Sequence, residues 1–128
     1  MRAVALSVGL RGGSILVVAA IVFGIVGLSS SFRWVPEAPL LAGFLLVQVA
    51  TLYLTGRRAG KRATSLMAGA LAGAIAGALG GCAGGLTYLA FGKPAINIPV
   101  GLLAGALEGG IVGGAGAWLA SRRARWRL

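Results

Sequence analysis

Apolar residues fall into four long segments, separated by short stretches that are rich in charged or turn-forming residues. The segments cover residues 12–31, 38–56, 65–91 and 96–120. A helix rises about 1.5 Å per residue, so about 20 apolar residues cross the roughly 30 Å hydrocarbon core of a bilayer. The pattern therefore predicts an all-α, polytopic membrane protein, with residues 1–128 forming a single four-helix transmembrane bundle.

Local signals indicate where the helices begin. Prolines at positions 36 and 39 suit the first turn of the second helix, and Asn97 is a suitable N-cap ahead of Pro99. Residues 1–11 are expected to form a short interfacial stretch. An alternative is that residues 1–31 are a cleaved signal peptide, because two arginines precede an apolar run that ends in three serines.

The composition supports the membrane class and limits the chemistry. Hydrophobic residues make up 58% of the chain and charged residues 11%, against about 25% charged in soluble domains. With no histidine and only Cys82, the chain offers neither an internal disulfide nor a Cys/His metal cluster. No paired nucleophile and base is recognisable. We therefore predict no metal, no cofactor and no enzyme activity.

The positive charge is distributed unevenly around the segments. Of the 12 basic residues, all but Arg33 and Lys93 lie before the first segment, between the second and third, or after the fourth. The positive-inside rule then places both termini in the cytoplasm, across a plasma or inner membrane. The basic residues would also attract anionic lipid headgroups at that face. Nucleic-acid binding is not predicted, because no soluble basic module with interleaved aromatic residues is present.

Glycine recurs every four residues in the third and fourth segments. These two ladders consist of Gly69, Gly73, Gly77, Gly81 and Gly85, and of Gly101, Gly105, Gly109 and Gly113. An offset of 32 residues aligns the two, which indicates an internal duplication whose copies run antiparallel. Small residues let helix backbones approach closely in lipid. We expect glycine-ladder packing of the third and fourth helices, with a spare small-residue face on the third helix available to another subunit.

Two polar residues fall within the apolar segments. Glu108 is the only charged residue inside a predicted span, and Gln48 lies at a comparable depth in the second span, so it is the expected hydrogen-bond partner. Intramembrane acids usually face a bundle interior or a water-filled cavity. Glu108 is therefore either a proton or cation site, or a protonated hydrogen-bond clamp that holds Gln48 or a partner subunit.

Two functions remain open at this point. The first is a non-enzymatic membrane subunit or scaffold that associates through its glycine-rich helices into a homo- or hetero-oligomeric complex. The alternative is a small proton- or cation-coupled channel or transporter that uses Glu108. The sequence is not assigned to a known family.

Overall fold

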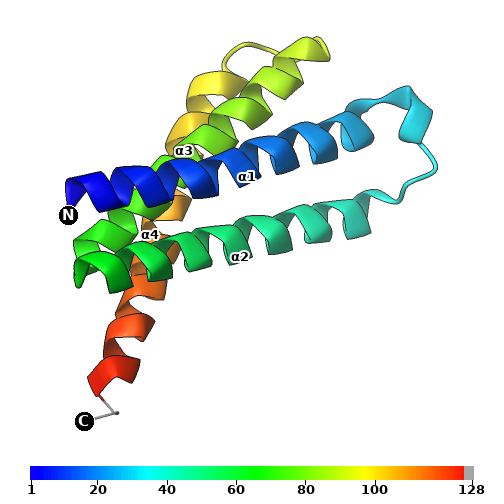
Figure 1. Ribbon diagram of the computed structural model, residues 1–128. Coiled ribbons are helices and arrows are strands. Elements are labelled where there is room, and N and C mark those ends of the chain that lie inside the picture. Colours follow the sequence, from blue (N-terminus) through cyan, green and yellow to red (C-terminus); the bar gives the residue numbers. More distant parts are fainter. Residues whose placement is uncertain (126–128) are drawn as a thin grey trace.

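The computed structural model describes residues 1–125, with side chains described to Arg122. It is all-helical, as predicted, with four long helices and one short 3-10 turn at Ser30–Phe32 (Figure 1). Each of the four is long and apolar enough to cross a membrane. The helices are α1 (Arg2–Leu28), α2 (Glu37–Ala63), α3 (Leu66–Ala90) and α4 (Asn97–Arg125).

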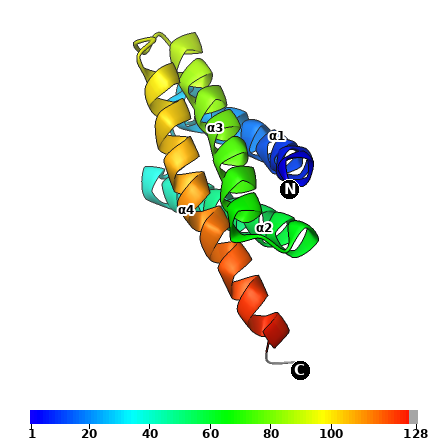
Figure 2. The same cartoon turned by 90° about the vertical axis from the view of Figure 1, so that its left-hand side faces the viewer.

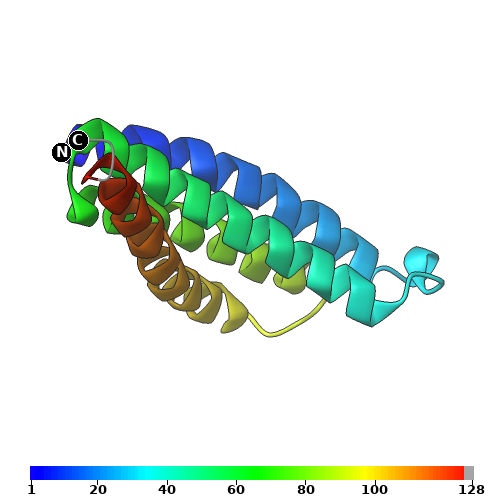
Figure 3. The ribbon, with the colours of Figure 1, turned by 90° about the horizontal axis from the view of Figure 1, so that it is seen from below.

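The helices form two antiparallel hairpins, α1–α2 and α3–α4, that cross each other (Figures 1 and 2). Helix α3 contacts all three other helices, and α2 also contacts α4, whereas α1 and α4 do not meet among the described residues. We call the end that holds the start of α1, the α2–α3 turn and the end of α4 the basic end. The end that holds residues 29–36 and 91–96 is the open end, because the hairpins diverge there (Figures 1 and 3).

Two helices extend through segments that were expected to lie outside them. Residues 1–11 are not a separate interfacial stretch, because α1 begins at Arg2, and Ala5 and Val8 pack in a buried cluster with Ala59 and Ala72. The basic residues 57–62 are likewise helical, since α2 continues to Ala63 with its small residues turned inward.

The connection between α2 and α3 is correspondingly short. Thr64 is the C-cap of α2 and has a left-handed backbone with φ of 48°. The amide of Thr64 donates to the carbonyl of Gly60. Ser65 then caps α3 by accepting a hydrogen bond from the amide of Ala68. The tight turn brings α3 back alongside α2.

The interior of the bundle consists mostly of alanine and glycine. Leu52 is the one large side chain that is fully buried among the described residues. Large aliphatic residues instead face outward: Leu107 is 70% exposed and Ile111 is 74% exposed. Small residues inside and bulky apolar residues outside are typical of helices that pack closely while facing lipid.

Candidate functional site

The structure brings together the two polar residues of the apolar segments. Gln48 of α2 donates a hydrogen bond from Nε2 to Oε2 of Glu108 on α4, over 2.6 Å. Both side chains are half-buried. Each lies eleven residues into a helix that starts at the open end, Gln48 after Glu37 and Glu108 after Asn97. At 1.5 Å per residue, both lie about 16 Å from that end, which is why they meet.

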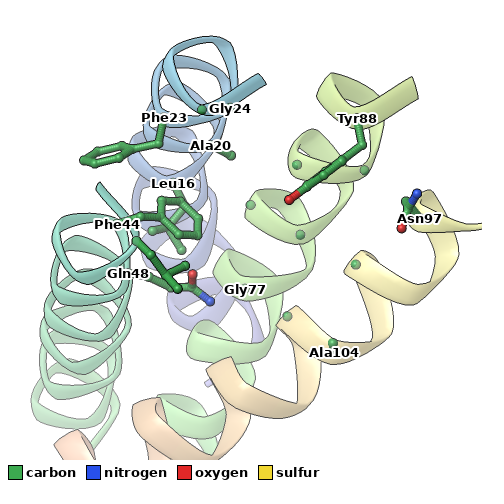
Figure 4. A pocket seen from close by; sticks show the side chains of 18 of the residues that line it. Leu16, Ala20, Phe23, Gly24, Phe44, Gln48, Gly77, Tyr88, Asn97 and Ala104 are labelled. Carbon is green, nitrogen blue, oxygen red and sulfur yellow. The ribbon is translucent and has the colours of Figure 1, made fainter. Parts of the chain in front are cut away.

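A cleft of about 460 Å³ leads to this pair and is lined by residues of all four helices. Its lining runs from Glu37 and Asn97, the first residues of α2 and α4, to Gln48 and Glu108. Figure 4 shows the cleft between the hairpins, with Phe44 and Gln48 on one side and Tyr88 and Asn97 on the other. The polar pair therefore lies at the deep end of a cavity that begins at the open end.

Glycine makes room for the cleft. Nine of its lining residues are glycines, drawn from α1, α3 and α4. Gly84 is the clearest case, because a methyl group added there would meet nothing within 4 Å. Gly84 thus faces open space inside the cleft, and its missing side chain is part of the cavity.

An apolar layer closes the cleft toward the basic end. Leu16, Leu52 and Ala76 form a buried cluster, and Val112 packs against it. Leu52 and Val112 each lie four residues, about one helical turn, beyond Gln48 and Glu108 respectively. We call these four residues the apolar seal.

Further toward the basic end, α2 and α4 touch through their backbones. A methyl group at Gly56 would overlap the backbone of Gly113, and one at Gly60 would overlap Ala117. The contact between the hairpins is therefore tight on the basic side of the polar pair, in contrast to the cleft on its other side.

The charged-type residues that line the cleft are both acids. Glu37 and Glu108 are the only two acidic residues of the chain, and both line this cleft. Within the part of the chain that the structure describes, no lysine or arginine lines it. Glu37 is exposed at the mouth, where the N-terminus of α2 favours a carboxylate. A chain with a net charge of +10 thus has both of its acidic residues in this cleft, while Arg33 lines an adjoining hollow together with Glu37.

The predicted ladder glycines all lie at the contact between α3 and α4. In the centre the contacts are reciprocal: a methyl group at Gly73 would overlap the carbonyl oxygen of Gly109, and one at Gly109 would overlap that of Gly73. The same relation joins Gly77 with Gly105 and Gly81 with Gly101. At the ends, Gly69 meets Gly113 and Ala117, and Gly85 meets Asn97 and Ile98.

The second small-residue face of α3 is covered within the same chain. Helix α1 packs there: a methyl group at Gly9 would overlap the carbonyl oxygen of Ala72, and one at Gly80 would overlap Leu16. The face that was expected to be spare is thus occupied by α1, and the expected oligomer gains no support from it. The glycines of α1 were not singled out from the sequence, although the four-residue spacing of Gly9 and Gly13 was a usable signal.

Comparisons with protein-family models, with curated proteins and with solved structures gave no match. Among the described residues, no three histidine, cysteine or acidic side chains gather where they could hold a metal ion. The function is therefore argued from the cleft and its polar floor.

Proposed function

We propose that this chain is a small multi-pass membrane transport protein in which Glu108 binds a proton or a cation at the floor of the cleft. The observation that carries the proposal is the position of the Gln48–Glu108 hydrogen bond, at the deep end of a cavity open at one end of the bundle. An acid at this depth is costly in lipid, and such residues usually mark an ion pathway, a proton relay or a binding site. Gln48 would hold the Glu108 carboxylate in place through one oxygen, and the other oxygen of Glu108 would bind the cation.

The orientation in the membrane is part of the proposal. Basic residues at both termini and in the last turns of α2 would lie in the cytoplasm and contact anionic headgroups of a plasma or inner membrane. The cleft would then open away from the cytoplasm, and the apolar seal would close it on the cytoplasmic side. Transport requires that this seal part while the mouth of the cleft closes.

The glycine contacts suggest which parts move. In lipid, helices associate through van der Waals contact and weak hydrogen bonds, so backbones that touch along two ladders make a stiff unit. We therefore assign the α3–α4 hairpin to one rigid body. The structure would open and close where the two hairpins meet. That contact is tight near the basic end and gives way to the cleft toward the open end.

The test is cation flux in liposomes that contain the purified chain. A pH-sensitive dye inside the vesicles reports proton flux, and external sodium or potassium gradients test the metal cations. We expect flux above that of empty vesicles for at least one of these ions. Glu108→Gln keeps the hydrogen bond but cannot titrate, so it should abolish the flux.

Glu37→Gln is the matched comparison, because it makes the same change in the chain's other acid. Glu37 is exposed at the mouth, so its loss should reduce flux less than Glu108→Gln does. Equal flux in wild type and Glu108→Gln would contradict the proposal, and so would the absence of flux above empty vesicles for protons, metal cations and organic cations alike. Thermal unfolding of each variant in detergent identifies any that fails to fold.

A second candidate function is the oligomeric membrane subunit, and one observation favours it. A methyl group at Gly110 would have only Ala74 and Ala70 of the same hairpin within 4 Å, the nearer at 3.8 Å. One at Gly114 would have only Ala70, at 3.7 Å. This seam of small residues could accept a helix of another subunit. Gly114→Leu would then dissociate the complex in native mass spectrometry. Gly73→Leu cannot test assembly, because Gly73 lies inside the chain's own α3–α4 contact.

A further inference from the structure

We propose that the ligand of the cleft is a monovalent organic cation, with a protonated or quaternary amine attached to an apolar body. The inference rests on the proposed function, because it assigns a substrate class to the same site. In the bound state the positive nitrogen lies near Glu108, and the apolar groups fill the cavity between the two hairpins.

The size of the cavity favours an organic ligand. Sites for small organic ligands enclose about 300–1,000 Å³, and a water molecule occupies about 30 Å³. The cleft encloses about 460 Å³. A pathway for protons needs only a single file of water molecules, which would occupy a small part of this volume. The volume of the cleft therefore matches an organic ligand better than a proton pathway.

The charges of the cleft favour a cation. Both acids of the chain line the cleft, one at its mouth and one at its floor, and no basic residue described by the structure joins them there. Clefts lined by charges of one sign concentrate ions of the opposite sign. A cationic ligand is therefore attracted to Glu108 at the floor, where no described basic side chain lines the cleft. At the mouth the attraction is weaker, because Arg33 lines an adjoining hollow together with Glu37.

The walls distinguish an organic cation from a metal ion. Hard metal ions need several oxygen ligands, about six for Mg²⁺ and six to eight for Ca²⁺. Beside Glu108 the structure offers only the Gln48 amide as a further polar side chain among the described residues, while Leu16 and Ala104 are apolar. An ion with an apolar body has less hydration to replace. Phe44 and Tyr88, on opposite sides in Figure 4, add aromatic surface that attracts cations.

The test uses two probes of the same shape that differ in charge. Benzyltrimethylammonium carries a fixed positive nitrogen, and neopentylbenzene has a carbon atom in its place. Binding is measured by equilibrium dialysis of the purified chain in nanodiscs, as the excess over empty nanodiscs of the same lipid. We expect the chain to bind the cation at least tenfold more tightly than the neutral compound. Glu108→Gln should weaken binding of the cation at least tenfold and leave the weak binding of the neutral compound unchanged.

A second variant tests the location independently of the acid. A Cβ added at Gly84 meets nothing within 4 Å, so Gly84→Leu should extend a side chain into the open space of the cleft, with the fold kept and binding lost. Ala115→Leu is the control, because it also adds a leucine side chain to the same hairpin, at an exposed position outside the cleft. Binding of the cation that survives Gly84→Leu, or is lost equally in Ala115→Leu, would overturn the assignment.

The results separate this inference from the proposed function. Proton flux that depends on Glu108, without binding of benzyltrimethylammonium, would refute the organic-cation assignment and leave the transport proposal standing. Binding that depends on Glu108, without flux of protons, metal ions or the probe, would support the site and refute transport. Equal binding of both probes would identify the cleft as an apolar groove for lipid chains and overturn the inference.

Discussion

Gly77 and Gly84 lie two turns apart on α3, yet a methyl group would meet very different surroundings at the two positions. At Gly77 it would overlap the backbone carbonyl oxygen of Gly105, well inside the 3.4–4 Å of ordinary contact, and at Gly84 it would meet nothing within 4 Å. Alanine at either position favours the helix by about 1 kcal/mol over glycine. That gain is common to both variants and cancels when they are compared.

The remaining difference is the cost of overlap at Gly77. A flexible side chain could move aside, but a carbonyl oxygen in the middle of α4 moves only with its helix, so the two helices must separate. Overpacking of this kind costs about 1–3 kcal/mol. Separation also weakens the neighbouring contacts of Gly73 with Gly109 and of Gly81 with Gly101. We expect Gly77→Ala to be less stable than Gly84→Ala by about 2 kcal/mol.

The free energy of unfolding can be measured for both variants by titrating mixed micelles with dodecyl sulfate and following the circular dichroism. Gly84→Ala should equal or exceed wild type, which excludes a general effect of alanine on α3. Stabilities of the two variants that agree within about 0.5 kcal/mol would show that the α3–α4 backbones are not in contact in the membrane protein, and would refute the reasoning.

Two further predictions concern single side chains. Gln48→Leu removes the donor and Glu108→Leu removes the acceptor of the hydrogen bond between α2 and α4. In a double-mutant cycle of these two changes, measured by the same titration, we expect a coupling of about 0.6–1.5 kcal/mol, typical of hydrogen bonds between membrane helices; a coupling of zero would contradict the hydrogen bond. Thr64→Gly should raise the stability by about 0.5–1 kcal/mol. The left-handed φ of 48° costs a residue with a Cβ about 1–2 kcal/mol, and the greater flexibility of glycine in the unfolded chain cancels about half of the gain from removing that cost. Thr64→Ala, which keeps the Cβ, should not show this gain.

The sequence was sufficient for the number of helices and for the polar pair. Four apolar segments give four helices because length and apolarity are what a bilayer demands of each one. Gln48 and Glu108 could be paired because each falls near the middle of its predicted span, 38–56 or 96–120, and so at a comparable depth. Position within a span gives depth but not direction, so it could not show that a cavity leads to the pair.

The errors at the helix ends have a common cause. Arg11 and residues 57–62 were assigned outside the spans because charged side chains are costly in lipid. Long basic side chains, however, keep their charged heads in water while their stems lie along a helix. The helices therefore continue beyond the apolar segments, as α1 and α2 do.

The cleft depends on how the two hairpins cross, which leaves no periodic signal in the sequence. Gly77 and Gly84 show the difficulty, since the same residue type on the same helix makes a backbone contact at one position and borders empty space at the other. Only the placement of α1 and α2 relative to α4 distinguishes them. The prediction of an oligomer from the small-residue face of α3 had the same limit, because the sequence could not show that α1 would cover that face.

The apolar seal provides the last prediction, because it is the layer that a transported ion would have to pass. Leu52 is 0% exposed, and with Leu16 it fills the space one turn beyond the acid, on the basic side. Leu52→Ala would leave a void there and cost about 2–3 kcal/mol in stability. Leu16 and Val112 would then be the only bulky residues left in the seal, so the variant should leak protons passively in liposomes.

Leu54→Ala is the control for that measurement, since Leu54 lies on the same helix, is 45% exposed and takes no part in the seal. It should neither leak nor lose more than about 0.5 kcal/mol. Combining Leu52→Ala with Glu108→Gln decides what the leak means. A leak that disappears in the double variant passes through the acid, as the transport proposal requires. A leak that persists unchanged runs elsewhere, and Glu108 would then be a structural hydrogen-bond clamp rather than a step on an ion pathway.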